Sequence, residues 1–120
     1  MRLMIVDDNT RVRKMIAEVA APPAAQVIEC ADGSQALPDY LRHRPDVVLM
    51  DIALGHVDGI AAAGQIVGAD PQALVVMVTD YDGEELREAA RAAGACGYVL
   101  KENLFELRDL LERLGRGDPP

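Results

Sequence analysis

Residues 47–51 read Val-Val-Leu-Met-Asp, four consecutive apolar side chains followed by a carboxylate. A short continuous apolar run is typical of a central strand in a parallel sheet, because such a strand is buried on both faces. Residues 74–79, Leu-Val-Val-Met-Val-Thr, repeat the pattern and end in a hydroxyl. The two runs therefore favour an α/β protein with its reactive side chains at the carboxyl ends of the strands.

The rest of the chain alternates between apolar runs and helical patterns. We predict strands over residues 3–6, 25–30, 47–50, 74–78 and 98–100. We predict helices over residues 10–20, after 32–34, from 58–59, over 83–93 and over 103–114. Such alternation is typical of βαβ units with right-handed crossovers. Because the run containing Glu29 reads as an edge strand, the pattern fits a flavodoxin-like, doubly wound, five-stranded parallel sheet of order 2-1-3-4-5 with five helices.

Four residues predict where helices bend, begin or end. Pro38 is expected to shorten or kink the first turn of the second helix. Gly94 is expected to end the fourth helix in the left-handed conformation. Asn103 is expected to cap the fifth helix, and Gly115 to close it.

Length and composition set limits on the function. The 120 residues suit one domain, expected over 1–115, with 116–120 as a tail or the start of a linker. The net charge of −8 disfavours direct nucleic-acid binding by this domain. The N-terminal apolar stretch is too short for a signal peptide or a membrane span. Cys30 and Cys96 fall on opposite edges of the predicted sheet, too far apart for a disulfide, so we expect a reduced, cytoplasmic protein.

Polar side chains end four of the predicted strands. Asp7 and Asp8 follow the first, Asp51 the third, Thr79 the fourth and Lys101 the fifth. Taken alone, each has an ordinary role; either of the first two aspartates could cap the following helix. Because the carboxyl ends of parallel strands meet at one edge of the sheet, we expect all five side chains to converge there.

The expected cluster has a specific chemistry. Three carboxylates beside one ammonium leave a local charge of about −2, which favours a bound cation. Oxygen ligands without Cys or His suit Mg²⁺. A carboxylate flanked by Mg²⁺, Lys and a hydroxyl can receive a phosphoryl group as the nucleophile. The chain has no Gly-rich phosphate-binding loop and no nucleophile-elbow motif.

These stretches resemble the receiver domain of bacterial two-component response regulators. The resemblance extends from Arg2 to Leu114 and rests on residues 5–8, 47–59, 76–79 and 94–101. It implies that Asp51 is the phosphoacceptor and that the metal ligands are Asp7, Asp8, Asp51 and the backbone carbonyl of Ala53. It also implies that Thr79 and Lys101 contact the phosphoryl group, and that Thr79 and Tyr98 form a switch.

The resemblance also implies the partners. The phosphoryl donor would be a phosphohistidine on a sensor histidine kinase or a phosphotransfer protein. The domain would catalyse only its own phosphorylation and slow dephosphorylation, and is otherwise not an enzyme. The face formed by the fourth helix, fifth strand and fifth helix would contact an output domain or a second copy of the chain.

Leu54, Gly55, Asp80 and Glu102 depart from the family's usual pattern, and the last two lie next to site residues. Asp80 stands after Thr79 where a small residue is usual, which adds bulk and negative charge at the mouth of the site. Glu102 replaces the Pro that usually follows the Lys, so we expect a trans peptide bond between Lys101 and Glu102.

Two other functions compete with this interpretation. A haloacid-dehalogenase-like phosphatase also has a nucleophilic Asp after a parallel strand, but it needs a second Asp two residues later, where this chain has Ala53. A degenerate, phosphorylation-independent interaction module is the other alternative, kept open by Asp80 and Glu102.

The fifth helix has one side chain out of pattern. Five leucines fall on one stripe at helical spacing, and Phe105 lies about 160° from its centre. We expect Phe105 to point away from the core, either folded over the start of its own helix or as a contact for a partner.

Overall fold

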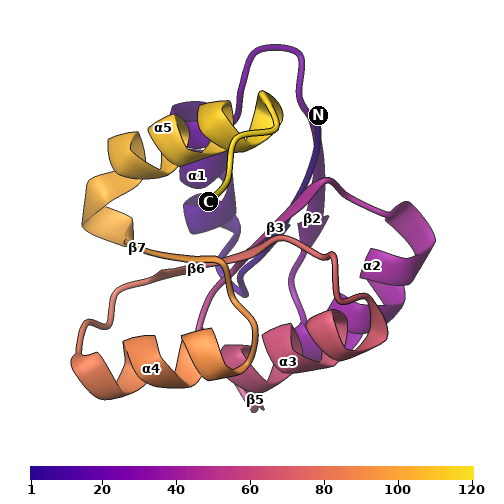
Figure 1. The fold of residues 1–120 in the computed structure, drawn as a ribbon, viewed down its shortest axis with the longest axis vertical. Helices are drawn as coiled ribbons and strands as arrows, with labels where there is room; N and C mark the ends of the chain where they lie inside the picture. Colours follow the sequence, from indigo (N-terminus) through magenta and orange to yellow (C-terminus); the bar gives the residue numbers. More distant parts are fainter.

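Five parallel strands form one sheet with the order β2-β1-β3-β6-β7 in the computed structural model, which describes residues 1–120 (Figure 1). The strands are β1 (Arg2–Val6), β2 (Gln26–Cys30), β3 (Val47–Met50), β6 (Val75–Thr79) and β7 (Gly97–Leu100). Since β6 and β7 are the fourth and fifth predicted strands, the doubly wound order 2-1-3-4-5 is confirmed.

Helices cover both faces of this sheet (Figure 1). On one face lie α1 (Thr10–Ala20) and α5 (Leu104–Gly115), side by side. On the other face lie α2 (Ala36–His43), α3 (Gly59–Ala69) and α4 (Glu84–Ala92). None of these helices combines the length and the apolar character needed to cross a membrane.

The core has two parts, one on each face, because strand side chains alternate. In β1, Leu3 and Ile5 pack toward α1 and α5, whereas Met4 and Val6 pack toward the opposite layer. The central strands β3 and β6 are buried at every residue, as their continuous apolar runs predict. Strand β2 is an edge strand with Glu29 exposed, also as predicted.

Several predicted helix ends are confirmed. Asp58 caps α3 by accepting a hydrogen bond from the Ile60 N–H at 2.9 Å. Gly94 follows the C-cap of α4 with a φ of +103°, the left-handed conformation. Pro38 lies in the first turn of α2, where backbone N–H groups have no partner within the helix, so its missing N–H costs no hydrogen bond. A short 3₁₀ turn, η1 (Gly33–Gln35), precedes the helix.

Three features differ from the predictions. A small antiparallel hairpin, β4 (Ala53–Leu54) and β5 (Val57–Asp58), follows β3; its two-residue strands are too short to show a period. Asn103 occupies the N-cap position of α5, as predicted, but its side chain makes no capping hydrogen bond, and the 3₁₀ turn η2 (Lys101–Asn103) leads into the helix. The prediction that Gly115 closes α5 is wrong, since Gly115 is the last helical residue and Gly117 takes the positive φ.

The stripe on α5 is confirmed. Its members are all buried, namely Leu104, Leu107, Leu110, Leu111 and Leu114. Phe105 points away from the core, with 72% of its surface exposed.

Candidate functional site

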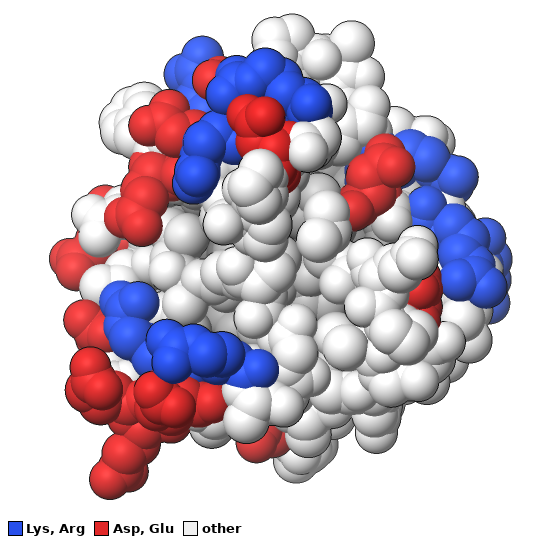
Figure 2. All heavy atoms as spheres, in the orientation of Figure 1, with Lys and Arg blue, Asp and Glu red and all other residues white.

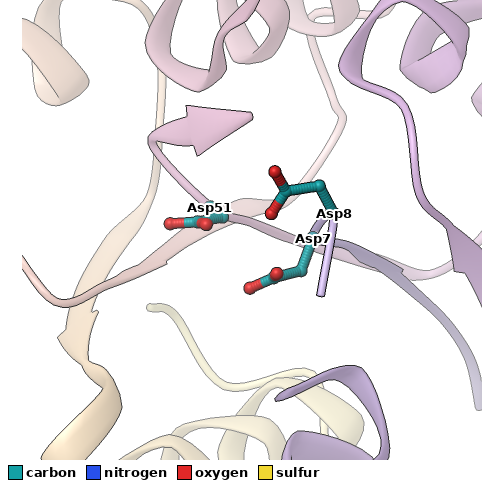
Figure 3. A group of neighbouring side chains, drawn as sticks. All are labelled: Asp7, Asp8 and Asp51. Carbon is teal, nitrogen blue, oxygen red and sulfur yellow. The ribbon is translucent and has the colours of Figure 1, made fainter. Parts of the chain in front are cut away.

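The carboxyl ends of the strands bring the predicted side chains to one edge of the sheet. Strand pairing continues into the site: the Asp51 N–H donates to the Val6 carbonyl, and the Asp7 N–H donates to the Cys30 carbonyl. One carboxylate oxygen each from Asp7, Asp8 and Asp51 lies within 4.8 Å of the others, and the three side chains point into the same space (Figure 3). Asp7 and Asp51 are buried, whereas Asp8 is exposed.

Lys101 joins this acidic group from the first residue of η2. Its Nζ lies 2.9 Å from Asp7 Oδ2, 3.2 Å from Asp51 Oδ2 and 3.9 Å from Asp80 Oδ2. The side chain is only 11% exposed, so its charge acts mainly on these carboxylates. The peptide bond between Lys101 and Glu102 is trans, as predicted.

Burial and charge shift both partners of the Asp51–Lys101 pair. Burial raises the pKa of Asp51 above its ordinary value of 3.8, and Asp7 adds to the effect, although Lys101 opposes it. Burial alone would lower the pKa of Lys101, but contacts with Asp7 and Asp51 outweigh it, so its pKa is raised. The ammonium is therefore held charged, while the ionised form of Asp51 is disfavoured.

The acidic group has the donor set of a metal site. Asp7 Oδ1 accepts the Asn9 N–H at 2.8 Å, and the buried Oδ2 forms an ion pair with Lys101 at 2.9 Å. The same ammonium also serves Asp51, so the carboxylates outnumber the one ammonium, and a bound cation would offset the excess negative charge. Asp7, Asp8 and Asp51 could therefore hold a metal ion, and a donor set made of carboxylate oxygens suits a hard cation such as Mg²⁺.

Thr79 and Tyr98 are connected through the backbone of Tyr81. Thr79 is fully buried at the end of β6, and its hydroxyl accepts the Tyr81 N–H at 3.2 Å. Tyr98, on β7, donates its hydroxyl hydrogen bond to the Tyr81 carbonyl at 2.6 Å. The Arg87 guanidinium lies 4.6 Å from the centre of the Tyr98 ring. Thr79 and Tyr98 therefore both hydrogen-bond to the backbone of the same residue, Tyr81.

Two residues that support the site were missed by the sequence reading. Asn9 caps α1, since its side chain accepts the Val12 N–H at 3.1 Å, so neither Asp7 nor Asp8 is the cap. Arg13 is buried and donates to the Asp7 backbone carbonyl. One feature of the sequence points to Arg13: it lies three residues before Ile16, so both side chains fall on the same buried face of α1.

Comparison with known proteins identifies the family. The model of the response regulator receiver domain matches residues 3–114. This chain belongs to the response regulator receiver domain family. It is 33% identical to the chemotaxis protein CheY of Bacillus subtilis over 116 residues, which cover 96% of this chain and 95% of that protein.

Other relatives of this receiver domain are longer. It is 33% identical to the transcriptional regulatory protein PdtaR of Mycobacterium tuberculosis over 92% of its own residues, but it spans only about half, 53%, of that protein. A solved LuxR-family two-component response regulator from Aurantimonas sp. SI85-9A1 superposes with a TM-score of 0.88 at 33% identity, covering 98% of this chain and 86% of that one. Receiver domains are signalling domains. The match spans almost all of CheY but only about half of PdtaR.

Proposed function

We propose that this receiver domain, residues 1–115, accepts a phosphoryl group on Asp51 in a Mg²⁺-dependent step and changes its surface in response. The observation that carries the proposal is the position of Asp51, whose Oδ2 lies 3.2 Å from the ammonium of Lys101 and whose carboxylate lies beside those of Asp7 and Asp8. A nucleophile in that position has both an ammonium and a group of metal-binding carboxylates next to it.

The chain's own residues supply most of the chemistry. A carboxylate oxygen of Asp51 forms a bond to phosphorus while the bond between phosphorus and the donor's imidazole nitrogen breaks, and that nitrogen keeps the electron pair. The ammonium of Lys101 pairs with a phosphoryl oxygen, and the hydroxyl of Thr79 donates a hydrogen bond to another. Mg²⁺, held by Asp7, Asp8, Asp51 and the Ala53 carbonyl, would neutralise charge on the transferring group when bound.

A phosphatase mechanism lacks a necessary group. Water that attacks the aspartyl phosphate needs a proton acceptor, and the residue two positions after Asp51 is Ala53, whose side chain cannot accept a proton. The phosphorylated form should therefore persist, as a signalling state requires. The phosphorylation-independent module is less well supported, because the complete acidic group and Lys101 are assembled.

The output follows from the link between Thr79 and Tyr98. When the Thr79 hydroxyl turns toward the phosphoryl group, its hydrogen bond to Tyr81 is lost, which frees the backbone that holds Tyr98. The surface of α4, β7 and α5 would then change and alter contact with an output domain or a second copy of the chain. A cytoplasmic histidine kinase or phosphotransfer protein would supply the phosphoryl group.

Intact-mass measurement after incubation with Mg²⁺ and phosphoramidate tests the proposal. We expect one phosphoryl group per chain, absent without Mg²⁺ and absent in Asp51→Asn, with Asp109→Asn as an exposed control that labels normally. Continuous release of phosphate without an adduct would instead indicate a phosphatase. Unlabelled protein under all conditions, in wild type and in Asp80→Asn alike, would indicate the phosphorylation-independent module.

A further inference from the structure

Asp80 stands at the mouth of the site, one residue after Thr79. Its side chain is 73% exposed, yet its Oδ2 lies 3.9 Å from Lys101 Nζ. The same ammonium already contacts Asp7 and Asp51, so three carboxylates share one cation. Asp80 is thus the outermost of these carboxylates and the one that an approaching molecule meets.

The charge of the loaded site depends on Asp80. Together, Asp7, Asp8, Asp51 and Asp80 against Lys101 leave three negative charges. A bound divalent cation leaves one, and that last charge is the one that Asp80 contributes. A phosphodonor is itself an anion, so it meets net repulsion at the entrance although the interior carries Lys101.

Resting on the proposed function, we infer that Asp80 is a specificity-determining residue that selects against small anionic phosphodonors, so that the phosphoryl group reaches Asp51 from a protein donor. A small acyl phosphate brings only negative charge. A protein surface can place a Lys or Arg against the exposed carboxylate of Asp80 and cancel its repulsion. The side chain's high exposure makes it accessible to such a partner.

The substitution Asp80→Asn isolates the charge, because it keeps the side chain's shape. Removing one charge near the path of an anion should speed labelling by acetyl phosphate by about three- to tenfold at low salt. The less highly charged phosphoramidate should gain less. Because the effect is electrostatic and acts at an exposed position, it should shrink at about 1 M salt, where the Debye length falls to about 3 Å.

The test measures the labelling rate of the whole chain against donor concentration, with Mg²⁺ saturating for each variant. The matched control is Asp82→Asn, which removes an exposed carboxylate two residues away that pairs with Arg87 and not with Lys101. We expect faster acetyl phosphate labelling of Asp80→Asn only, mapped to Asp51 and diminished by salt.

Each other result overturns the inference in a recognisable way. Equal rates for wild type and Asp80→Asn, with labelling at Asp51, overturn the role of Asp80 and leave the proposed function intact. Equal acceleration by Asp82→Asn shows a general effect of the net charge of −8. An acceleration that salt does not reduce shows that Asp80 acts through its local contact with Lys101 and not by repelling the donor. Absence of labelling at Asp51 in every variant, with both donors, overturns the proposed function as well.

Discussion

At the scale of the residue, Asp51 meets two opposing demands. A nucleophile that must receive a phosphoryl group has to be ionised and shielded from water, yet burial raises its pKa, as does the neighbouring Asp7. A folded-state pKa above the unfolded value of 3.8 means that the folded chain holds this proton more tightly than the unfolded chain. The ionised carboxylate therefore costs stability above the folded pKa, and the cost vanishes below pH 3.8.

The direction of this pKa shift predicts how Asp51 affects the stability of the metal-free protein. Asp51→Asn should unfold at a higher urea concentration than wild type at neutral pH, because the substitution removes a buried charge. The difference should disappear as the pH falls below 3.8, where both side chains are neutral. Urea unfolding at both pH values measures it, with the exposed Asp109→Asn expected to change little. A variant that is less stable than wild type at neutral pH would contradict the direction of the pKa shift.

Arg13 contributes at the same scale by holding the backbone of Asp7. Its guanidinium donates to the Asp7 carbonyl, to Glu29 at 2.9 Å and to Thr10 at 3.1 Å. Arg13→Ala leaves a buried carbonyl without its donor, so it should lower the free energy of unfolding by about 2 kcal/mol. The exposed Arg11→Ala should stay within about 0.5 kcal/mol of wild type. Equal urea midpoints for the two variants would refute a supporting role for Arg13.

At the scale of the element, the sequence predicts the strands and helices whose residue pattern is long and clear, and it misses the shortest elements. Strands β3 and β6 were predictable because every residue in them is buried and all but Thr79 are apolar. The β4–β5 hairpin was not, because its turn depends on Gly55, whose φ is +66°, and on burial of Leu54. The start of α5 was predictable from Asn103, which is its N-cap residue, but the 3₁₀ turn η2 before it was not, because a three-residue turn has no period to recognise.

The same reasoning explains which parts of the site were predictable. The aspartates, Thr79 and Lys101 could be placed because strand ends are visible in the sequence and parallel strands align their ends. The burial of Arg13 could not, because a charged residue on a helix is normally assigned to the solvent. The difference between the buried Asp7 and the exposed Asp8 also needed the structure, since either aspartate was a candidate to cap α1 and Asn9 caps it instead.

Helix α5 carries a prediction about association. Its leucine stripe accounts for its attachment to the core, so the exposed Phe105 has no part in packing. Phe105→Ala should cost less than about 0.5 kcal/mol of stability and should weaken self-association or binding to an output partner. Analytical ultracentrifugation with and without phosphorylation, alongside urea unfolding, measures both. The matched control, Leu107→Ala on the buried stripe, should lose about 2–5 kcal/mol. A large stability loss for Phe105→Ala with unchanged association would refute the interface role.

At the scale of the whole molecule, the effect of the net charge of −8 has to be distinguished from the effect of the negative charge concentrated at the site. Over the face in Figure 2, basic and acidic side chains lie next to one another along α4 and α5 and leave an uncharged area between them. On this face, charges on α4 and α5 are therefore compensated nearby, as in the pairs Arg91–Glu88 and Arg108–Glu112. The group of Asp7, Asp8 and Asp51 has only Lys101 to balance it, so a cation should act there first.

Thermal unfolding in millimolar Mg²⁺ tests this consequence. A cation that binds only the folded chain stabilises it by mass action, by about 1.4 kcal/mol at ten times its Kd, which should raise the Tm by several degrees for a chain of this size. NaCl at equal ionic strength screens the general charge and should raise the Tm less. Asp8→Asn should start at a Tm equal to or above that of wild type, because an exposed like charge is removed, yet should lose most of the Mg²⁺-dependent rise. The same rise with NaCl, or in Asp8→Asn, would show that Mg²⁺ acts on the molecule's overall charge and not at the ends of β1 and β3.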